Sequence, residues 1–212
     1  GTAHAQAVVP ELSKGEARVL GEEGNDDIGG ERLGAPGAPV GAVWVPCRPH
    51  WLVTVEENQG CVSIIDARTG ATVCKYTRTG DRYMPGLRTG ATGVAITPDS
   101  SLVIVADSRG NRVHVLRLVV AHATASLAFV RLIGSGPGSR GGQLEYPTGV
   151  AVLEDFATGA QTLLVTDENH RVSQFELETG AFVRIFAGSQ SGEEGSGDRE
   201  FNSPRGIAVL SG

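Results

Sequence analysis

The sequence contains little cysteine and no long apolar run, and each shortage excludes a class of protein. The three cysteines, Cys47, Cys61 and Cys74, fall in one part of the chain, and an odd number cannot form a complete disulfide framework. Their spacing differs from that of a Cys-x-x-Cys metal or redox pair, so we expect small buried apolar residues at these positions. No apolar run approaches the roughly 20 residues of a transmembrane helix, so no membrane span is predicted.

Positive charge is also scarce. The 18 lysine and arginine residues are outnumbered by 24 aspartate and glutamate residues, which gives a net charge of −6 and a pI near 5.4. Nucleic-acid-binding domains usually carry a basic stripe and have a pI above about 9. The charge balance therefore disfavours nucleic acid and anionic membranes as main partners.

Signals for targeting and glycosylation are missing as well. The first residues contain no charged segment followed by an apolar stretch, so no signal peptide is visible. The sequence contains no Asn-x-Ser/Thr acceptor, which removes one indication of secretion. The compartment therefore stays undefined, with a lean toward an intracellular protein.

The residues that are abundant indicate an all-β protein built from repeats. Hydrophobic residues make up 40% of the chain, and 30 glycines and 10 prolines provide many turns, which suits short strands better than helices. A Gly–aliphatic–Ala element recurs every 52 to 57 residues, beginning at Gly41, Gly93, Gly149 and Gly206. A period of this size is close to the roughly 40–50 residues of propeller repeats.

Each period contains four short apolar or alternating segments separated by turn residues, and these have the length and alternation of strands. Four antiparallel strands per period describe a β-propeller blade. The predicted blades cover residues 40–76, 93–133 and 149–187, and the second contains a long connection at residues 119–126. The glycine that opens each first strand is expected to permit close backbone approach around the channel.

Three segments resemble the NHL-repeat propeller family, whose pattern is roughly Phe-x-x-Pro-x-Gly-Ile-Ala-Val, then Val-Ala-Asp, a turn with Asn, and Arg-Ile/Val. The segments are Phe201–Val209, Val105–Val113 and Val165–Val172. The first repeat has Glu56 in place of the turn aspartate and Cys61 in place of the arginine, and it is equally similar to the related YVTN-type repeats. The resemblance extends from about residue 16 to the end, and it implies a β-propeller with four-stranded blades.

Counting strands predicts an incomplete propeller. The chain divides into an N-terminal extension at residues 1–15, expected to be poorly ordered, and a partial propeller at residues 16–212. Segments 16–20 and 206–210 each have the pattern of a single strand from an incomplete blade, so the chain holds about three full blades. Closed propellers typically have 4–8 blades. We therefore expect a fragment of a longer protein, or a ring that another chain completes.

Three carboxylates, Glu56, Asp107 and Asp167, occupy equivalent positions after the second strand of each blade. Three oxygen ligands in a ring could bind a cation. In two blades an arginine follows closely, and an Asp–Arg pair within each blade favours an internal brace of charge-assisted hydrogen bonds. We predict no metal site and no cofactor. The positions assigned to the structural repeat are Gly41, Gly93, Gly149, Gly206, Asp107, Arg112, Asp167 and Arg171.

Other candidate motifs each lack a required part. No histidine has metal-ligand spacing with another histidine or a cysteine, and His114 aligns with Ser63 and Ser173 as an ordinary strand residue. The glycine-rich segment at residues 134–142 looks like a phosphate cradle. It lacks the Gly-Lys-Ser/Thr end and the following helix that phosphate binding needs, so we expect a flexible loop between blades.

Polar loops on a rigid scaffold commonly carry function. We therefore place the candidate binding surface on the loops between blades and on the turns after the second strands. This surface, the loop face, comprises Asn58, Arg109, Tyr146, Glu168, His170 and Arg205.

The sequence contains no catalytic constellation, so the first hypothesis is a non-catalytic scaffold that binds a partner protein or peptide through the loop face. The alternative is a propeller enzyme of the hydrolase or lyase type, with a metal at the central channel. The third hypothesis is RNA binding, which the acidic balance disfavours. All three depend on analogy with the fold, which by itself does not determine function.

Overall fold

The computed structural model describes residues 39–57, 60–77, 87, 90–155, 157–195, 197 and 200–209. The predicted extension at residues 1–15 and the predicted strand at residues 16–20 lie outside this part of the chain. Within it, every regular element is a strand except one short 3-10 turn, η1 (Ser108–Gly110). No helix among the described residues is long and apolar enough to cross a membrane.

The strands form three four-stranded antiparallel sheets, each built from strands that are consecutive in the chain. The first sheet comprises β1 (Pro39–Val45), β2 (Arg48–Glu56), β3 (Cys61–Asp66) and β4 (Ala71–Tyr76). The second comprises β5 (Ala91–Ile96), β6 (Leu102–Asp107), β7 (Arg112–Ala121) and β8 (Thr124–Ile133). The third comprises β9 (Gly149–Glu154), β10 (Gln161–Asp167), β11 (Arg171–Glu176) and β12 (Phe182–Gly188). The predicted fold class, an all-β array of four-stranded propeller blades, is confirmed.

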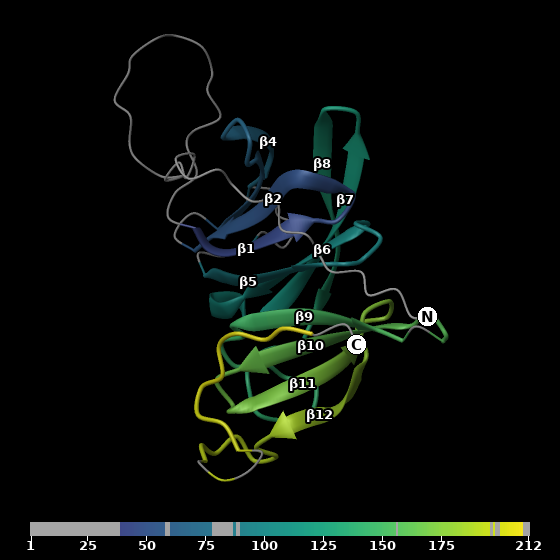
Figure 1. Cartoon of the computed structure of the whole chain (residues 1–212). Coiled ribbons are helices and arrows are strands. Elements are labelled where there is room, and N and C mark those ends of the chain that lie inside the picture. Colours follow the sequence, from purple (N-terminus) through teal and green to yellow (C-terminus); the bar gives the residue numbers. More distant parts are fainter. Residues whose placement is uncertain are drawn as a thin grey trace.

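The three blades follow one another in chain order, and the middle blade forms a core on each of its faces (Figure 1). Successive residues of a strand point to opposite faces of the sheet. Val105 and Leu116 therefore pack in the core shared with the first blade, whereas Ile104 and Val115 pack in the core shared with the third. All four side chains are buried.

The hairpin of β7 and β8 is longer than its counterparts. Residues 119–126, predicted as a connection, instead continue both strands, and only His122 and Ala123 form the turn. The chain reverses there because His122 adopts a left-handed conformation with φ of 53°. The extra length carries Val120 and Ala125 onto the core of the first blade, beside Leu127 and Phe129, so tertiary packing supports strand where the sequence is rich in alanine and turn-like residues. Figure 1 shows this hairpin projecting past the second blade.

The inner strands β1, β5 and β9 approach closely at their glycines. A Cβ atom added at Gly41, Gly93 or Gly149 would lie less than 3.0 Å from a carbonyl oxygen of the following inner segment. Those oxygens belong to Thr92, Thr148 and Arg205, each of which directly precedes the next glycine of the repeat. Only glycine lacks a Cβ, so a glycine is needed at each point where neighbouring inner strands approach this closely. The glycines therefore recur once per blade.

A second contact repeats between the same segments. The Thr92 hydroxyl donates to the Pro147 carbonyl at 3.2 Å, and the Thr148 hydroxyl donates to the Pro204 carbonyl at 2.9 Å. Residues 206–209 thus begin where a fourth inner strand would begin, beside β9. They pair with no strand in the described part of the chain, where no further sheet offers a partner, and residue 210 lies outside it. The strand expected at 206–210 therefore stays a prediction.

Candidate functional site

The three repeat carboxylates lie at the same register in their blades. Each pairs with the first residue of the following strand, as Glu56 with Cys61, Asp107 with Arg112, and Asp167 with Arg171. All three carboxylates are at most 1% exposed. A buried carboxylate requires hydrogen-bond and charge partners, so the partners in each blade decide what these groups can do.

In the second blade, Asp107 has an arginine and a histidine as partners. Its Oδ2 atom lies 3.1 Å from Arg112 Nε and 3.1 Å from His114 Nε2, and its Oδ1 atom accepts a bond from the Gly110 amide at 3.0 Å. Burial would raise the pKa of Asp107, but the hydrogen bond and charge of His114, followed by those of Arg112, hold that pKa below its usual value. Asp107 is therefore a stable anion within a salt-bridge cluster.

In the third blade, the arginine turns toward a loop instead of its aspartate. Arg171 Nη1 donates to the Ser139 carbonyl, and Nη2 donates to the Gln143 carbonyl at 2.9 Å. Only Nε is left near Asp167, at 3.5 Å from Oδ1. Burial therefore dominates and raises the pKa of Asp167, although Asn169 and Arg171 act against it.

The glycine-rich loop at residues 134–142 consequently has the wrong polarity for phosphate. Its carbonyl oxygens point at the buried guanidinium of Arg171, and the Gly138 carbonyl accepts a bond from Asn169. A phosphate cradle needs converging N–H groups, whereas this loop presents oxygen atoms to a cation. The loop was expected to be a flexible connection, and the structure shows it held in place by Arg171.

In the first blade, a lysine from the outer strand replaces the missing arginine. Glu56 Oε1 accepts a bond from Ser63 at 3.2 Å and lies 3.6 Å from Lys75 Nζ. Burial, followed by the hydrogen bond and charge of Glu56, raises the pKa of the Cys61 thiol to about 11. Since the thiolate is the nucleophilic form, Cys61 is poorly reactive at neutral pH. Cys74 is half-buried, whereas Cys47 is exposed, unlike the burial expected for all three cysteines.

The carboxylates do not gather into a metal site. Among the described residues, no group of three His, Cys, Asp or Glu side chains is placed to hold a metal ion. Each carboxylate belongs to a different blade and is engaged by its own partners. Each blade therefore contains a buried carboxylate with a basic side chain as partner, and the identity of that basic residue differs between the first blade and the other two.

The sequence did not reveal three of these partners, His114, Ser63 and Lys75. His114 and Ser63, aligned as ordinary strand residues, both reach the carboxylate of their own blade, and Ser173 is buried at the same position. Lys75 was not considered because it is two strands from Glu56 in the chain. The available signal was the polar residue two positions after the start of the third strand, since residues two apart share a face of a sheet.

The loop face lies at the end of the strands where the three carboxylates lie. Asn58 is outside the described residues. The side chains of Arg109, Tyr146, Glu168 and Arg205 are exposed, and that of His170 is half-buried. Four of the predicted residues therefore have solvent-exposed side chains, and their role in binding stays a prediction.

Two repeated hydrogen bonds fix the loop-face backbone. Asn111 Oδ1 accepts a bond from the Tyr146 amide at 2.8 Å, and His170 Nδ1 accepts one from the Ser203 amide at 2.9 Å. Asn111 and His170 both precede the arginine of their blade and both adopt left-handed φ values, 53° and 56°. His170 is thus a clamp between the third blade and the loop that follows it, with one ring nitrogen already engaged.

These clamps connect the predicted loop-face residues in series. Tyr146 is held by Asn111, close in the chain to Arg109. Glu168 donates its amide to the carbonyl of Glu145, the residue before Tyr146. Arg205 follows the Ser203 segment that His170 holds. The loop face is therefore one continuous set of loops at the end of the second and third blades.

Comparison with known proteins identifies the fold without a family. The sequence matches no protein-family profile and no curated protein. An auxiliary nutrient-binding protein from Bacteroides ovatus superposes with a TM-score of 0.61 at 15% identity, over 82% of this chain and 43% of that protein. The corresponding protein from Bacteroides thetaiotaomicron gives 0.57 at 18% identity, over 79% and 42%. The WD40 repeats of RRP9 give 0.54 at 14% identity, over 72% and 39%.

The chain thus spans less than half the length of the solved structures it matches. At this level of identity, such likenesses show the fold alone. They agree with the repeat, the three sheets and the inner-strand glycines, and they do not distinguish NHL repeats from other propeller repeats. The chain has the fold of β-propeller proteins.

Proposed function

We propose that this chain is a non-catalytic propeller scaffold of the NHL type that binds a partner protein or peptide through its loop face. The observation that carries the proposal is that the backbone of the loop face is fixed by hydrogen bonds while its side chains are exposed. Asn111 and His170 hold the loop backbones, while Arg109, Tyr146 and Arg205 present their side chains to solvent. Preorganised loops lose little conformational entropy when a partner binds.

The composition of the loop face also supports a protein partner. Tyrosine and arginine are, with tryptophan, the residues most enriched at the energetic centres of protein interfaces. Tyr146 is 45% exposed although it is large and aromatic, and its backbone φ of 42° is kept by the Asn111 clamp. Arg109 and Arg205 flank it along the chain of loops, with Glu168 adding an acidic group.

The two other hypotheses receive less support. A metal-dependent enzyme needs converging ligands, and no such group occurs among the described residues. RNA binding needs a basic surface, and the net charge is −6. A scaffold role requires neither feature.

The proposal is tested by site-specific photo-crosslinking in a lysate of the source cells. A photoreactive phenylalanine analogue is placed at Tyr146, and in a second protein at Phe186, an exposed aromatic residue of the outer strand β12. We expect a discrete adduct from position 146 that position 186 does not give. Arg109→Ala with Arg205→Ala should reduce that adduct at least tenfold.

The matched control is Arg117→Ala with Arg184→Ala, which removes two exposed arginines from the strands β7 and β12. It should leave the adduct unchanged. The same adducts from both positions, or an adduct equally sensitive to both pairs of substitutions, would show that the loop face is not the binding surface.

A further inference from the structure

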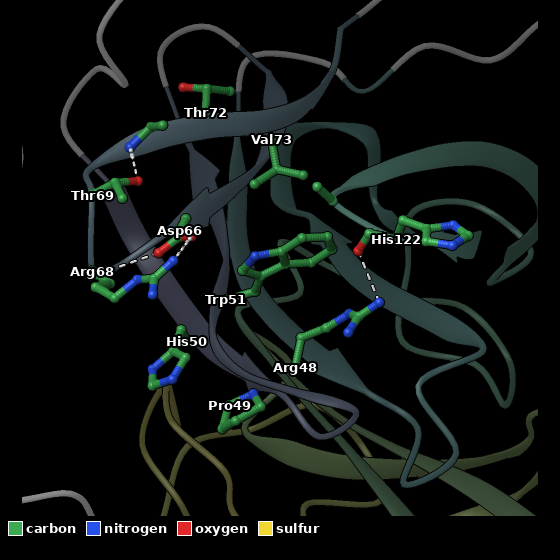
Figure 2. A pocket seen from close by; sticks show the side chains of 12 residues that line it. Arg48, Pro49, His50, Trp51, Asp66, Arg68, Thr69, Thr72, Val73 and His122 are labelled. Atoms are coloured by element: carbon green, nitrogen blue, oxygen red, sulfur yellow. Dashed lines mark hydrogen bonds and ion pairs between the residues drawn. The ribbon is translucent and has the colours of Figure 1, made fainter.

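A pocket lies at the opposite end of the strands from the loop face. β2 starts at Arg48 and ends at Glu56, and β7 starts at Arg112 and ends at Ala121, so Arg48 and the turn at His122 lie away from the carboxylates. The β3–β4 turn, with Arg68, lies at this same end. The start of β2 and these two turns border an open pocket of about 480 Å³, which we name the turn pocket (Figure 2).

The long β7–β8 hairpin supplies one wall of the turn pocket. Its tip contacts the first blade through a bond from Arg48 Nη2 to the His122 carbonyl at 2.8 Å. Cys74, on the outer strand of the first blade, is engaged by the Leu127 backbone of the same hairpin. The hairpin tip therefore adds His122 and Ala123 to a pocket that is otherwise lined by the first blade, and the volume is within the range of ligand sites.

The turn pocket is cationic in an acidic protein. Arg48, His50, Arg68 and His122 line it, and among the described residues of its lining Asp66 is the one acidic side chain. Asp66 lies 3.9 Å from Arg68, whose side chain is 72% exposed. At neutral pH the lining carries more formal positive than negative charge, which attracts an anion.

Arg48 is the least compensated of these charges. Its guanidinium lies 5.5 Å from the centre of the Trp51 ring and donates to one carbonyl, but no carboxylate among the described residues pairs with it. Its Nε atom is buried without a hydrogen-bond partner. A buried donor without a partner is costly, and a carboxylate brought to this guanidinium would supply charge-assisted bonds.

The arrangement also has an apolar centre. Figure 2 shows Trp51 between Arg48 with His122 on one side and Arg68 with Asp66 on the other. Trp51 is 7% exposed and Val73 is half-buried, so the apolar surface in the pocket consists of the exposed edge of Trp51 and part of Val73. Two cationic groups that flank an apolar surface match a chain segment with acidic residues on both sides of an apolar one.

We propose that the turn pocket binds an acidic peptide segment of a partner protein. One carboxylate pairs with Arg48 and a second with Arg68, while an apolar side chain between them packs over Val73 and the exposed edge of Trp51. This site is separate from the loop face, so the two proposals fail independently. The ligand proposed for the turn pocket also differs from the partner proposed for the loop face, since binding in the pocket requires carboxylates.

The test is fluorescence anisotropy with a labelled, C-terminally amidated Glu-Leu-Glu-Leu-Glu peptide and the full chain at low salt. We expect saturable binding that weakens with added salt, because exposed charge pairs are screened. The peptides Gln-Leu-Gln-Leu-Gln and Lys-Leu-Lys-Leu-Lys should not bind. Arg48→Gln should weaken binding at least tenfold.

Two further variants separate loss of binding from loss of folding. Arg68→Gln changes an exposed side chain and is expected to weaken binding several-fold while leaving the circular dichroism spectrum unchanged. Arg184→Gln, on the third blade, removes an equal charge and should have no effect. The proposal would be overturned if the neutral peptide bound as tightly as the acidic one, or if the Arg48 and Arg68 variants bound the acidic peptide as tightly as the wild type. It would also be overturned by full displacement of the peptide with millimolar phosphate, or by no binding at millimolar peptide.

Discussion

At the scale of single residues, the two aspartates of the repeat have different environments despite their equivalent positions. Asp107 is held by Arg112 and His114, both at 3.1 Å. Asp167 has a more distant arginine, because Arg171 directs its Nη atoms to loop carbonyls. The same residue type at the same register therefore has its pKa shifted in opposite directions.

This difference predicts unequal responses to Asp→Asn substitution. The lowered pKa of Asp107 means that its ionised form adds stability above the unfolded-state pKa, and that this stability is lost as the pH falls through the folded-state value. Asp107→Asn should therefore cost about 3 kcal/mol of unfolding free energy at pH 7, with a smaller difference from the wild type near pH 3. Urea unfolding at a series of pH values measures this.

Asp167→Asn is the matched comparison. Its raised pKa means that Asp167 adds stability only below the unfolded-state pKa, and that this is lost as the pH rises through the folded-state value. Removal of its charge should therefore cost at most about 1 kcal/mol at pH 7, as for a typical hydrogen bond. Equal losses for the two substitutions would show that the partners of these aspartates do not set their pKa values.

At the scale of elements, the loop between the second and third blades is held by Arg171 from β11 and by Asn169 just before that strand. Arg171 is fully buried and reaches carbonyls on both sides of Arg140. A planar guanidinium can donate to several acceptors at once, whereas a lysine ammonium is a point charge on a flexible stem. The order of this loop therefore depends on the following blade as well as on the hydrogen bonds within the loop.

Arg171→Lys should release the loop while the blades stay folded. We expect trypsin cleavage after the exposed Arg140 to accelerate about tenfold, because local opening makes the loop backbone accessible. The amides of Ser135 and Leu144, which bond within the loop, should exchange faster. Arg184→Lys on β12 is the control and should change neither rate. An unchanged cleavage rate in Arg171→Lys would mean that other contacts hold the loop.

At the scale of the whole molecule, the same contacts recur at each junction between neighbouring inner strands. The glycine of each inner strand faces a backbone carbonyl of the next inner segment, and in two steps a threonine hydroxyl adds a bond. The middle blade contributes to cores on both of its faces. Stability in such an array is approximately the sum of repeat and interface contributions, so an interface contact affects the whole molecule.

Gly93→Ala is the sharpest test of this packing. The added Cβ would clash with the Thr148 carbonyl, and the two blades would have to separate, which we expect to cost about 1–3 kcal/mol, as overpacking does. Gly206→Ala is the matched control, since nothing lies within 4 Å of its Cβ position, and it should change stability by less than about 0.5 kcal/mol. Chemical denaturation measures both. A neutral Gly93→Ala would show that the glycine repeat does not set the blade spacing.

The fold was predictable because the repeat constrains it at several levels. The spacing of Gly41, Gly93 and Gly149, the alternation of the strands and the turn residues all point to the same four-stranded unit. The continuation of β7 and β8 through residues 119–126 was not predictable in this way. Those residues have polar and alanine-rich stretches, and they form strands because the hairpin packs against the first blade.

The candidate site was predictable only in part. The equivalence of Asp107 and Asp167 is visible in the sequence, as is the arginine that follows each of them. The orientation of that arginine is not, because it depends on where the carbonyls of a distant loop lie. The turn pocket gave no sequence signal, since Arg48, Arg68 and His122 come from one strand and two turns that lie far apart in the chain.

The sequence by itself determined the repeat unit, its strands and the positions where blades must approach closely, because periodicity and glycine act locally. Only the tertiary structure decided which base faces each carboxylate, which loop Arg171 holds, and which turns meet to form the turn pocket. These features arise from contacts between segments far apart in the chain, and side-chain directions across such contacts are set by packing rather than by local pattern.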